Sequence, residues 1–262
     1  MAHMRTRQFR VRGLVLTLLA ALALLVAMAG CGDEVQPTES TATATETSGG
    51  GESMGGASQT VNFTTADDMM LSGRVFGSGK TGVVLAHMYP ADQTSWFPTA
   101  EELAASGYLV LTFDFRGYGD STGSKDIELI DLDVEAAVSE IEARGAQTVG
   151  LVGASMGGTA CLVVAARLPV AAVATLSAPV EFRGLSVADA ISAVRAPKIF
   201  IAAEDDVGAE GARKLFQAAV EPKEIDVVPG SDHGTNLLTG SSGIEVHEVL
   251  LSFLKENLPI VP

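Results

Sequence analysis

The chain has 262 residues and a formal net charge of −15, with 32 Asp and Glu residues against 17 Lys and Arg residues. Four of the basic residues and none of the acidic ones lie in residues 1–31, which leaves a formal charge of −19 on residues 32–262. A strongly acidic chain repels polyanions at long range, so we expect no nucleic-acid partner. Hydrophobic residues make up 47% of the chain and aromatic residues only 5%, a composition that suits a large buried parallel sheet.

Residues 1–31 begin with a basic flank that leads into an apolar run. Residues 1–4 resemble a cloning remnant before a natural start at Met4, and four arginines precede an uncharged run at 13–30. This order is typical of a secretory signal. The run also has the minimum length of a membrane-spanning helix, so a retained anchor is the alternative.

The apolar run ends in Met28-Ala29-Gly30-Cys31, which resembles the lipobox of bacterial lipoproteins, with Met28 where Leu is more usual. The resemblance implies a tag remnant plus lipoprotein signal peptide over residues 1–31. It also implies that Cys31 is acylated and becomes the new N-terminus. The mature protein would then be exported and lipid-anchored to the extracytoplasmic face of the cell membrane.

The remaining sequence divides into a linker and one domain. Residues 32–58 are mainly Thr, Ser, Gly and Glu without apolar periodicity, a composition that predicts a flexible tether. Such a tether spans about 30 Å. Residues 59–262 have the length of a single domain. Its one cysteine, Cys161, lies in an apolar helical stretch, so we expect a buried thiol and no disulfide framework.

Strand and helix patterns alternate along this domain. Residues 59–77 predict two strands around an Asp67-Asp68 turn, at an antiparallel edge. Six nearly continuous apolar runs predict buried strands at 82–87, 108–115, 148–153, 170–178, 198–204 and 224–230. Helical patterns occupy 98–107, 127–145, 157–168, 210–220 and 243–258, and Gly107 and Gly145 are expected to end two of them. The alternation predicts an α/β fold with a doubly wound, mostly parallel eight-stranded sheet and helices on both faces. No insert is long enough for a large lid domain.

Two stretches match the pattern G-x-S-x-G, one centred on Ser121 and one on Ser155. A nucleophile elbow requires the serine directly after a strand, with a helix beginning at once. Ser155 meets this requirement, whereas a glycine-rich loop separates Ser121 from its strand. We therefore predict Ser155 as the nucleophile and Ser121 as a local hydrogen-bonding residue. The alternative for Ser155 is a helix-start serine without chemistry.

A nucleophilic serine needs a base and an acid that orients the base. His233 is the predicted base, because it lies in a glycine-flanked loop after the last strand. His247 falls in the last predicted helix and His87 at the end of a strand. The acid is expected among three consecutive carboxylates that follow the strand at 198–203, namely Glu204, Asp205 and Asp206.

Five motifs in order resemble the alpha/beta-hydrolase family over residues 60–258. They are VVLAHMYP (83–90), LTFDFRGYGDS (111–121), GASMGG (153–158), AAEDD (202–206) and GSDHG (230–234). The resemblance implies that His87 braces its loop and that the backbone N–H groups of Met156 and Tyr89 form an oxyanion hole. It also selects Asp206 as the acid, three residues after Ala203, with Asp205 as the runner-up.

One position departs from the family pattern. Met88 stands where the family usually has Gly. Gly can adopt backbone angles that other residues avoid. If the loop needs such angles, Met88 changes its conformation.

The sequence as a whole predicts a membrane-tethered serine hydrolase that cleaves small-molecule carboxylic esters through Ser155, His233 and Asp206. No metal or organic cofactor is implied, and the oligomeric state stays open. The short lid segment and the acidic surface favour an open site and small neutral esters. Two alternatives stay open: a non-catalytic binding lipoprotein on the same fold, and a haloperoxidase-like or dienelactone-hydrolase-like enzyme.

Overall fold

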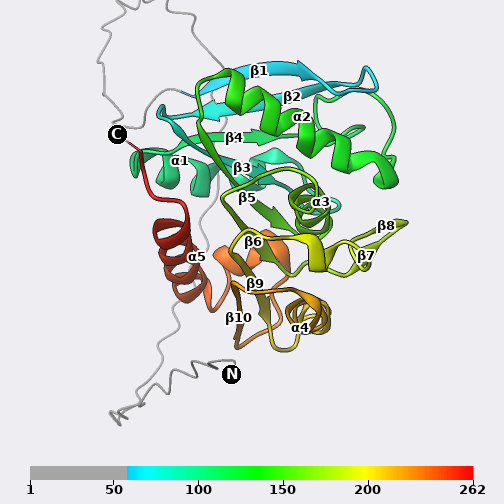
Figure 1. Ribbon diagram of the computed structural model, residues 1–262, viewed down its shortest axis with the longest axis vertical. Coiled ribbons are helices and arrows are strands. Elements are labelled where there is room, and N and C mark those ends of the chain that lie inside the picture. The colour runs from blue at the N-terminus through cyan, green and yellow to red at the C-terminus, as the bar shows by residue number, and fades with distance from the viewer. Residues whose placement is uncertain (1–57, 262) are drawn as a thin grey trace, which may run out of the picture. The chain divides into compact units, whose positions relative to one another are not determined.

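The computed structural model describes residues 58–261, which fall within one compact unit (Figure 1). The predicted signal, the lipidation site at Cys31 and residues 32–57 of the predicted tether lie outside the described residues. In the part of the chain that is described, no helix has the length and apolar character needed to cross a membrane.

An eight-stranded sheet forms the centre of the domain. Its strands are β1 (Gln59–Thr64), β2 (Met70–Phe76), β3 (Thr81–Ala86), β4 (Leu109–Phe113), β5 (Thr148–Ala154), β6 (Ala172–Leu176), β9 (Lys198–Ala203) and β10 (Lys223–Val228). They lie in the order β1-β2-β4-β3-β5-β6-β9-β10. Only the β1–β2 and β2–β4 pairs are antiparallel. The predicted mostly parallel sheet with an antiparallel edge is therefore confirmed.

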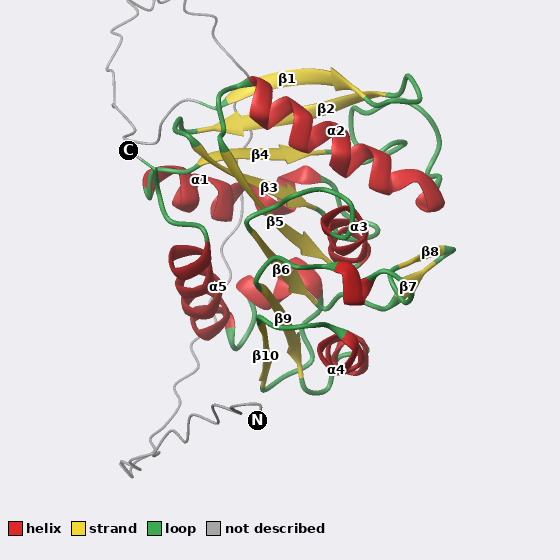
Figure 2. Ribbon diagram, viewed as in Figure 1, coloured by secondary structure: helices red, strands yellow, loops and turns green. Residues whose placement is uncertain are grey.

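Helices cover both faces of this sheet (Figure 2). On one face lie α2 (Ile130–Ala143), α3 (Met156–Ala165) and α4 (Gly208–Ala218); on the other lie α1 (Phe97–Ala105) and α5 (Gly243–Asn257). Each face buries its own apolar cluster against the sheet. Gly107 and Gly145 follow α1 and α2 with φ values of 98° and 109°, so both act as the predicted helix ends. Cys161 is fully buried in α3, and burial raises the pKa of its thiol.

Several predicted boundaries were too wide. The run at 170–178 yields a strand only at 172–176, because only these residues pair with β5. The predicted helix at 127–145 begins as a 3-10 turn, η2 (Ile127–Leu129), before α2. A small hairpin, β7 (Glu181–Phe182) and β8 (Leu185–Ser186), was not predicted. Between β6 and β9 only this hairpin and a 3-10 turn at Ile191–Ala193 are present, so no large lid forms in the described residues.

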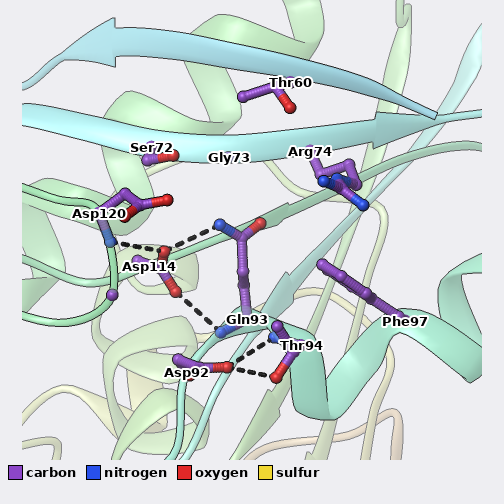
Figure 3. A pocket seen from close by; sticks show the side chains of 11 residues that line it. Thr60, Ser72, Gly73, Arg74, Asp92, Gln93, Thr94, Phe97, Asp114 and Asp120 are labelled. Carbon is purple, nitrogen blue, oxygen red and sulfur yellow. Dashed lines mark hydrogen bonds between the residues drawn. The ribbon is translucent and has the colours of Figure 1, made fainter. Parts of the chain in front are cut away.

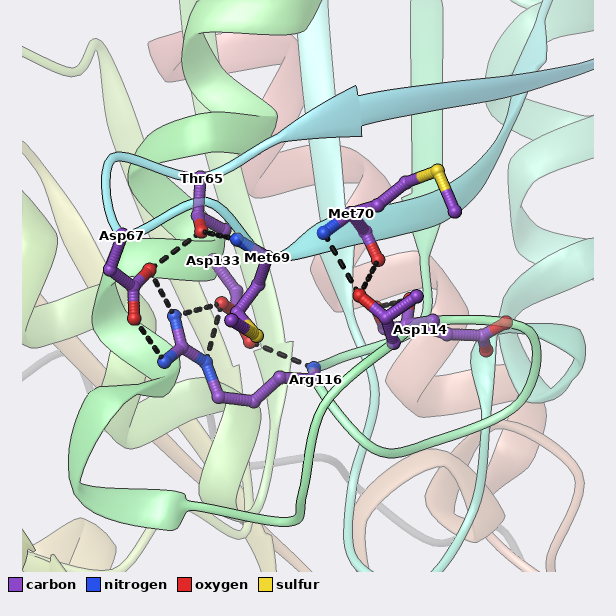
Figure 4. A network of polar contacts seen from close by, with 9 residues as sticks. Thr65, Asp67, Met69, Met70, Asp114, Arg116 and Asp133 are labelled. Carbon is purple, nitrogen blue, oxygen red and sulfur yellow. Dashed lines mark hydrogen bonds and ion pairs between the residues drawn. The ribbon is translucent and has the colours of Figure 1, made fainter.

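An ion-pair network around the buried Arg116 fixes the turn that follows β4 (Figure 4). Arg116 is 2% exposed and donates through Nε to Asp133 at 2.9 Å and through a terminal nitrogen to Asp67 at 2.7 Å. Burial opposes the charge of Arg116, but the hydrogen bonds to both carboxylates raise its pKa overall. The bond from Arg116 lowers the pKa of Asp67 to about 2, whereas burial raises that of Asp133 to about 6. The network links α2, the β1–β2 turn and the turn after β4.

Removing the buried carboxylate of this network should destabilise the fold. We expect Asp133→Asn to lower the free energy of unfolding by about 3 kcal/mol, because it leaves a buried guanidinium with only one carboxylate. Asp131→Asn on the same helix is the matched control. Asp131 pairs with Arg167, whose side chain is 43% exposed, so its loss should cost less than about 1 kcal/mol. Urea denaturation measures the free energy of unfolding of both variants. Equal losses would show that burial of the Arg116–Asp133 pair adds nothing to its effect on stability.

Asp114 and Ser121 form further hydrogen bonds that stabilise the turn after β4. The carboxylate of Asp114 accepts hydrogen bonds from the backbone and side-chain nitrogens of Gln93, each at 2.9 Å. The hydroxyl of Ser121 donates to the carbonyl of Asp114 at 2.6 Å and accepts from the backbone N–H of Ser72 at 2.9 Å. Ser121 is therefore the local hydrogen-bonding residue that the sequence predicts.

Candidate active site

Ser155 occupies a sharp turn between a strand and a helix. Strand β5 ends at Ala154 and α3 begins at Met156, so Ser155 alone makes the turn. Its φ of 48° lies in the left-handed region, which costs a non-glycine residue about 1–3 kcal/mol and is typical of functional sites. Helix α3 lies close to the end of β3 because Gly157 has no Cβ. A Cβ there would lie 2.5 Å from the carbonyl oxygens of Ala86 and His87.

The structure brings Ser155, His233 and Asp206 together although 78 residues separate the first two. The hydroxyl oxygen of Ser155 lies 2.8 Å from Nε2 of His233. Nδ1 of His233 lies 2.9 Å from each carboxylate oxygen of Asp206. A carboxylate accepts the Nδ1 proton, which leaves the lone pair of Nε2 facing the serine hydroxyl. Ser155 is 5% exposed and the His233 side chain 32% exposed, so solvent reaches this group of residues.

Of the three consecutive carboxylates, only Asp206 faces His233. Strand β9 ends at Ala203, and the backbone N–H of Asp206 then bonds back to the carbonyl of Ala203 at 3.2 Å. This turn directs Asp206 inward, where its side chain is 4% exposed. Glu204 and Asp205 are exposed.

The two predicted oxyanion donors lie at the ends of neighbouring segments. Met156 is the first residue of α3, where a helix leaves its N–H groups without intrahelical partners. Tyr89 follows β3, and its N–H belongs to the peptide whose carbonyl, Met88 O, accepts from Nδ1 of His87 at 2.9 Å. Because a peptide is planar and trans, this N–H points away from His87. Within residues 58–261 neither N–H donates to another group.

His87 is a buried neutral histidine that braces this loop. Its Nε2 accepts from the backbone N–H of Phe115 at 3.1 Å, which leaves the ring proton on Nδ1 for Met88 O. Burial lowers its pKa, and its ring packs against Phe115 and Tyr118. His247 instead lies 3.1 Å from Glu102 and joins α5 to α1.

Met88 does not need the backbone freedom of glycine. It is absent from the residues with positive φ, so the loop adopts angles open to any side chain. Its sulfur lies 3.8 Å from the hydroxyl of Thr235, and it would lie 2.5 Å from a Cβ on Gly234. Met88 therefore packs against the loop that carries His233, a contact that the family pattern does not predict.

A polar cavity of about 280 Å³ lies apart from these residues (Figure 3). Arg74, Asp92, Gln93 and Asp114 line it, and neither Ser155 nor His233 does. The carboxylates of Asp92 and Asp114 already accept hydrogen bonds from the backbone N–H groups of neighbouring residues. We interpret the cavity as a by-product of the hydrogen bonds that fix the loop after β3 and the turn after β4.

The sequence analysis missed a group of aromatic and basic residues beside the site. The hydroxyl of Tyr118 lies 3.9 Å from the sulfur of Met156, the residue after Ser155. The rings of Tyr89 and Phe182 lie 5.8 Å apart, and the guanidinium of Arg183 lies 4.3 Å from the centre of the Tyr89 ring. Phe182 and Arg183 belong to the unpredicted β7–β8 hairpin, so only tertiary structure brings them here.

Comparison with known proteins agrees with this architecture. The model of the alpha/beta hydrolase fold family matches residues 82–224, from β3 into β10. The chain belongs to the alpha/beta hydrolase fold family. The matched region contains the Ser155 elbow and the Asp206 turn, whereas His233 follows it.

Relatives and solved structures extend the likeness beyond the family match. An uncharacterised protein of Mycobacterium tuberculosis is 28% identical over 207 residues, which cover 68% of this chain and 73% of that protein. Epoxide hydrolase A of the same organism is 39% identical over 115 residues, covering 40% of this chain and 35% of that enzyme. The esterase Pf2001 of Pyrococcus furiosus has 20% sequence identity and a TM-score of 0.69, over 77% of this chain and 93% of the esterase. This last likeness concerns the fold alone.

Proposed function

We propose that this protein is a serine hydrolase that cleaves carboxylic esters of small molecules through an acyl-enzyme. Ser155 is the nucleophile, His233 the base and Asp206 the acid that orients the base. The backbone N–H groups of Met156 and Tyr89 stabilise the oxyanion. The observation that carries the proposal is the continuous set of contacts from Ser155 through His233 to Asp206, at a strained turn between strand and helix.

The reaction follows from these positions. His233 Nε2 takes the hydroxyl proton as the oxygen of Ser155 attacks the ester carbonyl, and the charge that develops on the carbonyl oxygen faces the two N–H groups. The protonated His233 then gives its proton to the leaving alcohol, and the acyl group stays on Ser155. A water molecule, deprotonated by His233, releases the acid and restores the serine hydroxyl.

Epoxide hydrolysis is a second candidate, favoured by the likeness to epoxide hydrolase A. The residue at the elbow weighs against it. An oxygen of Ser155 that opened an epoxide would form an ether, which the same site could not hydrolyse. An acyl group on Ser155 is an ester, which water can cleave.

Labelling with a fluorophosphonate probe tests the proposal. We expect stoichiometric modification of Ser155, detected by mass spectrometry of the tryptic peptides, together with turnover of 4-nitrophenyl acetate or butyrate. Styrene oxide is the parallel substrate for the second candidate. A protein that neither reacts with the probe nor hydrolyses any ester would instead match the non-catalytic binding alternative.

We further propose that the hydrolase is exported and anchored by a lipid on Cys31, on the support of the basic flank, the apolar run and the lipobox-like residues 28–31. Cys31→Ser should block acylation and signal cleavage, so the variant should migrate as the unprocessed precursor. Mass spectrometry of the mature N-terminus in a bacterial membrane fraction decides the matter. An unmodified N-terminus at another residue would contradict the anchor.

A further inference from the structure

Two basic side chains without acidic partners lie beside the Ser155 site. The guanidinium of Arg183 lies 4.3 Å from the centre of the Tyr89 ring and 5.4 Å from that of Phe182. The ammonium of Lys125 lies 4.3 Å from the centre of the Tyr118 ring. Both basic side chains are exposed, and within residues 58–261 neither forms an ion pair. Their charges are therefore available to a ligand.

The rings beneath these cations belong to one proposed oxyanion-donor residue and to a neighbour of the other. Tyr89 carries one of the proposed oxyanion donors, and Tyr118 contacts the side chain of Met156, which carries the other. Arg183 thus packs on the side chain of one donor residue, and Lys125 packs on the ring that contacts the side chain of the other. Two positive charges that are unpaired within residues 58–261 therefore lie near the site, although the chain as a whole is acidic.

The backbone holds Arg183 in a defined place. Arg183 and Gly184 form the two-residue turn of the β7–β8 hairpin, with φ values of 48° and 95°. Such turns favour Asn or Gly at the first position, so Arg occupies it against the usual preference. The hairpin packs against α3, the helix that begins directly after Ser155. The turn fixes the position of the Arg183 backbone, and the stacking on Tyr89 places the guanidinium over that ring.

One carboxylate lies close to the same turn. A Cβ on Gly184 would lie 2.5 Å from a carboxylate oxygen of Glu128, so this acid flanks the hairpin. It offsets part of the charge of Arg183 without forming an ion pair with it. Glu128 therefore offers a control that should change anion binding in the opposite direction.

We propose that Arg183, assisted by Lys125, binds a carboxylate of the substrate, so that the preferred esters carry a negative charge on either the acyl or the alcohol part. This inference rests on the proposed function, since it describes substrate choice at the same site. It replaces the expectation of neutral substrates drawn from net charge. Salt screens the distant acidic surface within about 8 Å, whereas a bound substrate meets the nearest charges directly. A guanidinium can also bind a carboxylate through two parallel hydrogen bonds.

Two substrate pairs, each a carboxylate and its methyl ester, test the proposal. On the acyl side, 4-nitrophenyl hydrogen adipate is compared with 4-nitrophenyl methyl adipate. On the alcohol side, 4-acetoxybenzoate is compared with its methyl ester. We expect the protein to prefer the charged member of at least one pair, and Arg183→Gln to lower kcat/KM for that member by about 10- to 100-fold, mainly through KM. The neutral members should change by less than about two-fold.

Three further variants separate local from global charge. Arg183→Lys keeps the charge and should retain part of the preference, and Glu128→Gln should strengthen it. Arg144→Gln removes the same charge at the end of α2, on the opposite edge of the sheet from Ser155, and should leave the preference unchanged. An equal loss in Arg144→Gln and Arg183→Gln would overturn the proposal, as would a charged-to-neutral ratio that Arg183→Gln does not alter.

Binding separates this proposal from the proposed function. If the protein hydrolyses no ester at all, the proposed function fails, and the subsite is judged by NMR titration with adipate and 4-hydroxybenzoate. Saturable binding that weakens about 10-fold or more in Arg183→Gln would support a carboxylate site without esterase chemistry. Binding that is absent, or unchanged in the variant, would overturn it.

Discussion

Ser155→Ala should reduce ester turnover by about 10⁴-fold or more, because the substitution removes the nucleophile and leaves only the binding and oxyanion groups. The far-ultraviolet circular dichroism should stay unchanged. Among residues 58–261 the hydroxyl makes one hydrogen bond, with His233. The backbone bond from the Ser155 N–H to the carbonyl of Leu176 at 2.8 Å does not need the side chain. Initial rates with 4-nitrophenyl butyrate measure the effect.

Ser121→Ala is the matched control, since Ser121 lies in the other G-x-S-x-G stretch. Its hydroxyl joins Asp114 to Ser72, so the variant should lose about 1 kcal/mol of stability and keep most of its activity. If the two variants lost activity equally, the choice of nucleophile from strand adjacency would be wrong.

Asp206→Asn should lower kcat by about 10²- to 10⁴-fold with little change in structure. An amide can donate to Nδ1 of His233, which favours the tautomer with its proton on Nε2. That tautomer cannot accept the proton of Ser155. A pH profile of kcat and KM for the variant, measured with a neutral ester, checks the prediction.

Asp205→Asn provides the comparison, because the same substitution falls one residue earlier on an exposed side chain. We expect nearly full activity from it. An inactive Asp205→Asn beside an active Asp206→Asn would mean that the acid acts from a different position in the turn. Full activity in both variants would remove the proposed acid from this loop.

The local pattern of the sequence determined most of the framework. Near-continuous apolar runs separated by amphipathic segments predict buried parallel strands and covering helices, because a strand buried on both faces has no polar side. Likewise Ser155 could be chosen over Ser121 from adjacency alone, since the position of a serine relative to the end of a strand is a local property. Gly107 and Gly145 predicted their helix ends for the same reason.

The ends of strands were less predictable, because the buried apolar residues extend beyond the residues that pair with a neighbouring strand. The residues that flank β6 stay apolar beyond the last pair with β5, so the apolar run overestimates the strand. The β7–β8 hairpin escaped prediction because two-residue strands carry no periodicity. Its turn residues, Arg183 and Gly184, also lack the Asn-Gly pattern that indicates such hairpins.

By itself, the sequence determined the fold class, the order of serine, acid and histidine along the chain, and the serine at the elbow. Each can be read from the order of residues or from the pattern of close neighbours in the chain. The residues alone left the acid open among three carboxylates, and the family resemblance selected Asp206. In the structure the turn after Ala203 directs Asp206 toward His233 and leaves Asp205 exposed. Only the tertiary structure decided that Met88 packs against the His233 loop and that Arg183 lies over Tyr89. The first contact joins residues 147 apart in the sequence and the second residues about 94 apart, and no local pattern of charge or hydrophobicity encodes a contact over such a separation.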